Sequence, residues 1–214
     1  MRYSTRLVAC VAALQLFGAT NVVAQRATLT GVFGGTSQDL LDAPFGAAFS
    51  LGTPVGRRVD LLLMVNRLQG TSNGTGVVCS GLVNPASCPS EPYTRQGRLS
   101  LIGIGADVHL ATTRLATLSF QPQFVWGRAQ TETNGKTTGN RLFSEKGQLG
   151  LTGGLELRAF PAPGRPLGVV LGGSFGTLGP ATTERRVDGY TPFNDWYSVH
   201  TVYAGLTWES RRRR

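Results

Sequence analysis

Residues 147–160, GQLGLTGGLELRAF, decide the fold, because apolar side chains alternate along them with polar or small ones. Leucines occupy one set of alternate positions, and Gln148, Thr152, Glu156 and Arg158 fall on the other set. Successive side chains of a β-strand point to opposite faces. The segment is therefore predicted to be a strand with one apolar face and one polar face that is rich in glycine.

The same alternation recurs along the chain and predicts eight strands. They cover residues 27–35, 45–55, 59–68, 99–110, 115–128, 147–160, 167–178 and 197–208. Each is about as long as the nine to eleven residues that a tilted strand needs to cross a bilayer. After the N-terminal region, no segment has the 18 or more consecutive apolar residues of a membrane helix. The fold class is thus all-β.

The composition favours a barrel with its apolar face outward. Glycine contributes 29 of 214 residues and only 15% of residues are charged, so the second face of the strands lacks the Lys and Glu of a solvated surface. In an outer-membrane barrel the apolar face meets lipid, and the polar face lines the lumen. Small residues suit the narrow lumen that eight strands enclose.

The predicted connections alternate between long and short. The long ones are 36–44, 70–96, 129–145 and 180–196, and the short ones are 56–58, 111–114 and 161–166. Outer-membrane barrels have long extracellular loops and short periplasmic turns. This pattern predicts an antiparallel, up-and-down transmembrane barrel with both chain ends in the periplasm.

The N-terminus is predicted to be an export signal that is cleaved. Residues 1–24 contain a basic start with Arg2 and Arg6, an apolar stretch LVACVAALQLFG, and Val22 and Ala24 at the small-residue cleavage positions. The apolar stretch is too short to cross a membrane as a helix. The expected organisation is a signal at 1–24, a barrel at 25–209 and a basic periplasmic tail at 210–214.

On this topology the chain resembles the small eight-stranded outer-membrane β-barrels, which include the OmpA membrane domain and OmpX. The terminal strand Tyr203-Ala-Gly-Leu-Thr-Trp208 is similar to the segment that the barrel assembly machinery reads, although Glu209, Ser210 and four arginines follow it. The resemblance implies a monomer in the bacterial outer membrane, with membrane lipids and the assembly machinery as partners.

Five ionisable residues are predicted to face the lumen. They are Asp60, Asp107, His109, Glu156 and Arg158. Unpaired charges in a narrow lumen are costly, so we expect these side chains to pair and to plug the barrel. A small gated pore is the alternative interpretation. The sequence indicates no cofactor, because it has neither a glycine-rich phosphate loop nor a metal-ligand motif.

Two further sets of residues are singled out by their side chains: a pair of cysteines, and a serine, a histidine and a glutamate. Cys79 and Cys88 lie in an exported, loop-like segment, and their spacing predicts a local disulfide. Ser198 and His200 are two residues apart, so they share one face of a strand, and Glu184 in the preceding loop is the candidate that would orient the histidine. Together these three are the candidate catalytic residues of a lipid acyl hydrolase.

The favoured function is a structural or surface-interaction role, with an extracellular ligand contacting residues 70–96 and 180–196. The alternatives are a narrow channel for small solutes, an outer-membrane lipid acyl hydrolase, and a secreted barrel that binds an apolar ligand. Nucleic-acid binding is not indicated, although the net charge is +9. Eight arginines fall at the predicted periplasmic end: Arg57, Arg58, Arg114, Arg165 and Arg211 to Arg214.

Overall fold

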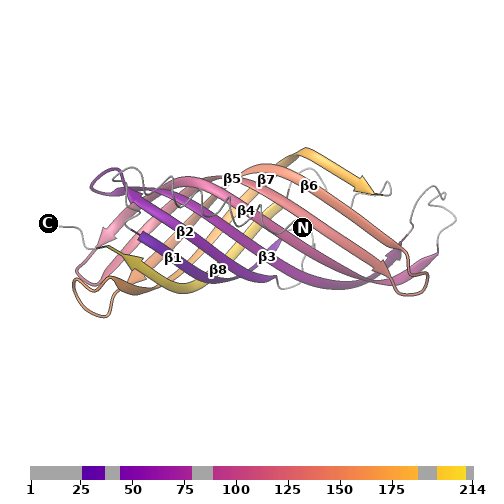
Figure 1. The fold of residues 1–214 in the computed structure, drawn as a ribbon, viewed down its shortest axis with the longest axis horizontal. Coiled ribbons are helices and arrows are strands. Elements are labelled where there is room, and N and C mark those ends of the chain that lie inside the picture. Colours follow the sequence, from indigo (N-terminus) through magenta and orange to yellow (C-terminus); the bar gives the residue numbers. More distant parts are fainter. Residues whose placement is uncertain (1–25, 37–43, 79–88, 188–196, 211–214) are drawn as a thin grey trace, which may run out of the picture.

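The computed structural model describes residues 26–36, 44–78, 89–187 and 197–210, and they form one closed barrel (Figure 1). The strands are β1 (Arg26–Thr36), β2 (Phe45–Pro54), β3 (Val59–Val77), β4 (Ser90–Thr112), β5 (Ala116–Gly135), β6 (Arg141–Ala159), β7 (Leu167–Val187) and β8 (Tyr197–Glu209). The predicted signal peptide, Cys79 and Cys88, and the four terminal arginines lie outside the described residues. Within the described part of the chain, no helix is long and apolar enough to span a membrane.

Each strand pairs antiparallel with the next one, and β8 closes the ring against β1. The closing register runs from Arg26 opposite Glu209 to Thr36 opposite Val199. The predicted fold, an eight-stranded antiparallel up-and-down barrel, is confirmed. Along the length of β1 and β8, closure pairs both edges of the sheet, which would otherwise present unsatisfied backbone groups.

The close approach of β1 and β8 depends on a glycine at the closing seam. A Cβ atom on Gly205 would lie 2.0 Å from the carbonyl oxygen of Leu29, so the strands would have to separate. We expect Gly205→Ala to lower the free energy of unfolding by ~1–3 kcal/mol, as overpacking does. Gly31→Ala is the control on the same seam, because its nearest neighbour would be 3.9 Å away. Urea unfolding of both refolded variants measures the difference, and equal losses would contradict this account.

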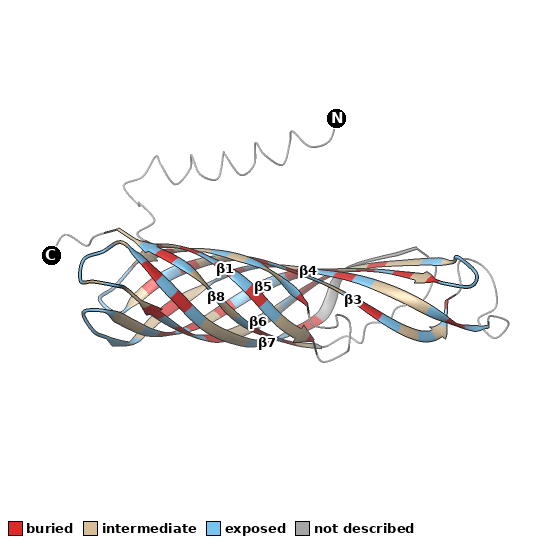
Figure 2. Cartoon of the chain, turned by 90° about the horizontal axis from the view of Figure 1, so that it is seen from below, coloured by how far each residue is buried: buried red, intermediate tan, exposed pale blue. Residues whose placement is uncertain are grey.

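The outer face of the barrel is apolar, and polar side chains line the lumen toward the end where short turns join the strands. Large apolar side chains on the outer face are exposed, among them Leu151 at 64%, Phe175 at 60% and Val202 at 62%. Their sequence neighbours are buried or half-buried, and Figure 2 shows the alternation of burial along the strands. A barrel in water would leave this apolar belt exposed, whereas lipid would cover it.

The two ends of the barrel differ. At one end, the turn end, short connections at residues 55–58, 113–115 and 160–166 join the strands, and β1 begins where β8 finishes. At the other, the extended end, β3 to β7 continue beyond β1, β2 and β8 (Figure 1).

The prediction that residues 70–96 and 129–145 are loops is therefore largely wrong, because residues 70–77, 90–96, 129–135 and 141–145 belong to strands. Of the predicted loop 180–196, residues 180–187 also belong to a strand. These parts carry no apolar alternation, since they lie beyond the apolar belt.

An apolar layer fills the lumen toward the extended end. Its buried members are Val32, Leu68, Leu99, Leu101, Val125, Ala129, Leu178 and Val199. The sequence predicted a lumen of small and polar residues, and this layer departs from that prediction. Because the layer packs inside the ring, it gives the barrel a hydrophobic core of the kind found in small soluble domains.

Candidate functional site

Asp107 of β4 is the centre of an ion network in the lumen at the turn end. Its side chain is fully buried, and its Oδ2 atom accepts hydrogen bonds from Arg26 Nη1 of β1 and from Arg158 Nη2 of β6, the latter at 2.8 Å. Its Oδ1 atom accepts one from Gln121 Nε2 of β5 at 3.3 Å. One carboxylate thus links side chains from three other strands.

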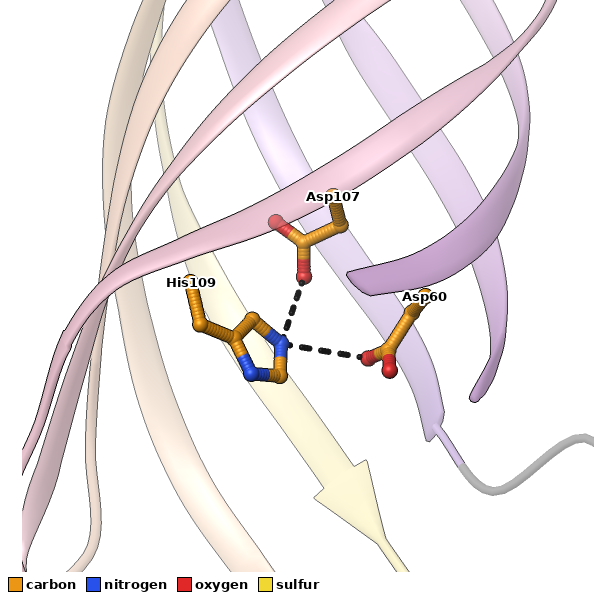
Figure 3. Close-up of side chains that lie close together, drawn as sticks. All are labelled: Asp60, Asp107 and His109. Carbon is orange, nitrogen blue, oxygen red and sulfur yellow. Dashed lines mark ion pairs between the residues drawn. The ribbon is translucent and has the colours of Figure 1, made fainter. Parts of the chain in front are cut away.

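Asp60 and Asp107 lie directly opposite each other on β3 and β4. Like charges in such a cross-strand pair repel. Arg26 Nη1 offsets this repulsion because it contacts both carboxylates and lies 3.4 Å from Asp60 Oδ2. His109 Nε2 approaches the same two oxygens, at 3.3 Å from Asp60 and 3.4 Å from Asp107 (Figure 3).

Arg158 extends the network to the end of the chain's last strand. Its Nη1 atom donates a hydrogen bond to Glu209 Oε1 at 2.7 Å, and its Nε atom lies 3.5 Å from Glu156 Oε1. The Tyr203 hydroxyl donates to the other oxygen of Glu156 at 3.3 Å. Arg158 is only 1% exposed, so it is stabilised by these partners and not by water.

The structure brings all five predicted lumen residues together, and it adds partners that the sequence interpretation missed. The additional members are Arg26, Gln121, Tyr203 and Glu209. For two of them the alternation does indicate a position on the lumen face. Arg26 falls on the same set of alternate positions as Thr28, and Glu209 falls on the same set as Thr207. Their contacts with Asp60, Asp107 and Arg158 depend on the registers of several neighbouring strands, which alternation does not specify.

Three members of the network have the chemistry of metal ligands. One ligand atom from each of Asp60, Asp107 and His109 lies within 4.8 Å of the others. However, Arg26 Nη1 contacts the same two carboxylate oxygens as His109 Nε2. A cation would have to displace this guanidinium group and tolerate Arg158 nearby. The geometry therefore favours an ion-paired plug over a metal centre.

Between the ion network and the apolar layer lies a cavity of about 40 Å³. Polar side chains from several strands line it, including Thr30, Asn66, Gln123, Thr152 and Thr201. Since one water molecule requires roughly 10–15 Å³ of cavity volume, this cavity has room for a few water molecules. In the described residues, side chains thus fill the lumen at two levels, with a water-sized gap between them.

The three hydrolase candidates are not brought together. Ser198 and His200 lie two residues apart on β8, and His200 pairs with Phe175 of β7 and Gly35 of β1. Glu184 pairs instead with Lys146, nine residues further along β7 than Phe175. At about 3.3 Å per residue, Glu184 lies roughly 30 Å from the position beside His200. The prediction that Glu184 orients His200 is wrong, because the segment that carries it continues as a strand away from β8.

The barrel resembles solved outer-membrane barrels in fold but not in sequence. Neisserial surface protein A (NspA) superimposes with a TM-score of 0.55 at 13% identity, over 86% of this chain and 96% of that one. This is the fold of the small eight-stranded outer-membrane β-barrels. A major outer membrane protein from Thermus thermophilus gives 0.50 at 12% identity, over 86% and 98% of the two chains. No protein-family model and no curated protein matches the sequence.

Proposed function

We propose that this protein is a closed barrel of the bacterial outer membrane that displays the extended end of its sheet as an interaction surface outside the cell. The observation that carries the proposal is the unequal length of the strands. β2 pairs with β3 only as far as Gln69, yet β3 continues to Val77. Likewise, β8 pairs with β7 as far as Leu178, and β7 continues to Val187.

The orientation in the membrane follows from the two ends. Short turns face the periplasm in barrels of this class, and the longer segments face the exterior. The turn end would therefore be periplasmic and the extended end extracellular. The exposed apolar belt between them supports a position in lipid.

The extended end is stabilised at its tip. The Glu91 carboxylate of β4 accepts hydrogen bonds from the backbone N–H groups of Thr137 and Thr138 at 2.7 and 2.9 Å, in the turn between β5 and β6. The Asn140 side chain donates to the Val78 carbonyl oxygen at 3.0 Å. These contacts fasten the β5–β6 turn to the ends of β3 and β4, so the sheet presents a defined surface.

Side chains at the extended end suit recognition. The Arg95 guanidinium lies over the Tyr93 ring at 5.1 Å, and Arg95 Nε donates to the Thr133 hydroxyl at 3.2 Å. Arginine and tyrosine are enriched at protein interfaces. The filled lumen also supports display over conduction, since both the ion network and the apolar layer lie across it.

The test compares the full-length barrel with a shortened one. In the shortened variant, two-residue Asn-Gly turns join Ser72 to Arg95 and Thr131 to Ser144, which pair with each other across the strands. A shift in gel migration on boiling establishes that each barrel is folded. We expect bacteria that express the full-length protein to adhere to cultured epithelial cells or to one another, and bacteria with the shortened barrel to lose this adherence.

A control variant and a conductance measurement complete the design. Replacing Arg57, Arg114 and Arg165 by glutamine alters only the turn end and should leave adherence unchanged. Planar bilayers that contain the wild-type barrel should show no regular conductance steps. Equal adherence of full-length and shortened barrels, or steady single-channel steps in wild type, would refute the proposal.

The tip of the extended end is expected to respond to pH through Glu91. Hydrogen bonds from the Thr138 hydroxyl and from the backbone of Thr138 and Thr137 hold the pKa of Glu91 below its ordinary value of 4.5. A lowered pKa means that the stabilisation is complete above the ordinary value and is lost as the pH falls through the lowered one. Amide hydrogen exchange at Thr137 and Thr138 should be slow at neutral pH and faster in Glu91→Gln. Glu145→Gln is the control, and equal exchange in all three proteins would contradict the role of Glu91.

A further inference from the structure

The turn end of the lumen opens into a vestibule of about 580 Å³ that is strongly basic. Six arginines line it against two carboxylates, Asp60 and Glu209. The arginines are Arg26, Arg57, Arg58, Arg114, Arg158 and Arg165. With His109 counted as neutral, the lining has a net charge of +4. This excess of positive charge plays no part in the extracellular role proposed above, which concerns the other end of the barrel.

Both carboxylates of the vestibule already have cationic partners. Asp60 contacts Arg26 and His109, and Glu209 accepts a hydrogen bond from Arg158. In contrast, none of the rim residues Arg57, Arg58, Arg114 and Arg165 makes an ion pair with another described residue. The positive charge at the rim is therefore uncompensated.

The rim arginines converge from three separate turns. Arg57 and Arg58 belong to the β2–β3 turn, Arg114 to the β4–β5 turn, and Arg165 to the β6–β7 turn. All four are exposed, so their guanidinium groups are free to move toward a ligand. Like charges around one opening repel each other, and an anion bound between them would relieve that repulsion.

The floor of the vestibule holds buried donors without acceptors. Arg26 is only 2% exposed, and its Nε and Nη2 atoms have no hydrogen-bond partner among the described residues. The Nε atom of Arg158, which is 1% exposed, makes no hydrogen bond to a described residue either, although Glu156 Oε1 lies 3.5 Å away. The other atoms of these two guanidinium groups pair with the carboxylates of the ion network, so the floor contributes hydrogen-bond donors, and the uncompensated positive charge lies at the rim. In a partly enclosed space such charge acts more strongly than in bulk water.

We propose that the vestibule binds a phosphate-bearing anion. The planar guanidinium group offers paired donors that match the oxygens of phosphate, and arginine is preferred where phosphate is recognised. The volume falls within the roughly 300–1,000 Å³ of small-molecule sites. The vestibule opens at the end that would face the periplasm, beside the membrane surface. The phosphate is carried either by a small soluble ester or by a lipid headgroup.

The soluble form is tested by titrating pyrophosphate into the full-length barrel in nanodiscs of phosphatidylcholine, by calorimetry. We expect Arg57→Gln/Arg114→Gln/Arg165→Gln to weaken binding by about tenfold or more, since charge-assisted hydrogen bonds are lost from three turns. The corresponding triple lysine variant keeps the charge but loses the planar fork, so its affinity should be intermediate. Arg67→Gln/Arg98→Gln removes two exposed arginines far from the vestibule and is the matched control.

The lipid form is tested by adding phosphatidylglycerol to the nanodiscs and measuring its enrichment around the barrel. If the triple glutamine variant loses that enrichment while pyrophosphate fails to bind wild type, the phosphate belongs to a headgroup. If pyrophosphate binds and the variant weakens it, the ligand is soluble. The proposal is overturned if the triple variant changes neither measurement, or if the control pair changes them equally. The gel shift on boiling shows beforehand that all the variants are folded.

Discussion

Replacing Asp107 by asparagine is expected to lower the free energy of unfolding by about 3–5 kcal/mol, as breaking a buried ion pair does. Asparagine keeps the size of the side chain but removes its charge. Arg26 and Arg158, both almost fully buried, would then lose the carboxylate that they share. Urea unfolding of the barrel refolded in lipid vesicles, followed by tryptophan fluorescence, measures the loss.

Glu145→Gln is the matched control for this substitution. Glu145 also pairs with an arginine, Arg128, at 2.6 Å, but the Arg128 side chain is 46% exposed. Exposed pairs contribute less than about 1 kcal/mol, because water solvates the separated charges. If both substitutions reduce stability equally, burial of the network does not matter, and the ion network is not what stabilises the lumen.

Leu151→Arg is expected to lower the free energy of unfolding in lipid by about 2–4 kcal/mol. Leu151 lies in the apolar belt on the outer face of β6, between Phe124 of β5 and Thr177 of β7, and it is 64% exposed. An arginine there would place a charge in the hydrocarbon layer. The measurement is reversible urea unfolding in phospholipid vesicles.

The conservative change Leu151→Phe keeps the position apolar and should leave stability nearly unchanged. A secreted barrel in water, one of the alternatives considered from the sequence, would tolerate the arginine well. Unchanged stability of Leu151→Arg in vesicles would therefore contradict the membrane orientation of the barrel. The pair of variants thus separates the two environments at a single position.

The two proposed interaction regions lie at opposite ends of one barrel. The extended end has ordered strands and Arg95 stacked on Tyr93, whereas the turn end has a basic vestibule. The filled lumen between them separates the two regions. Binding at one end therefore does not require passage of a ligand through the barrel.

The sequence alone determined the number of strands, their faces and the position of the turns. Alternation of side chains is a local property of an extended chain, so residues such as Leu151 and Glu156 reveal their faces without any knowledge of their neighbours. The alternation likewise identified Asp60, Asp107, His109, Glu156 and Arg158 as lumen residues.

Only the tertiary structure decided which of these residues meet. The pairing of Arg26 with Asp107 joins residues far apart in the sequence, and it depends on the registers of β1, β2, β3 and β4 against one another. The register of β7 against β8 places Phe175, and not Glu184, beside His200. The sequence also did not indicate how far β3 to β7 continue beyond the apolar belt. Their polar residues carry no apolar alternation, and backbone pairing between neighbouring strands, not an apolar face, continues the sheet there.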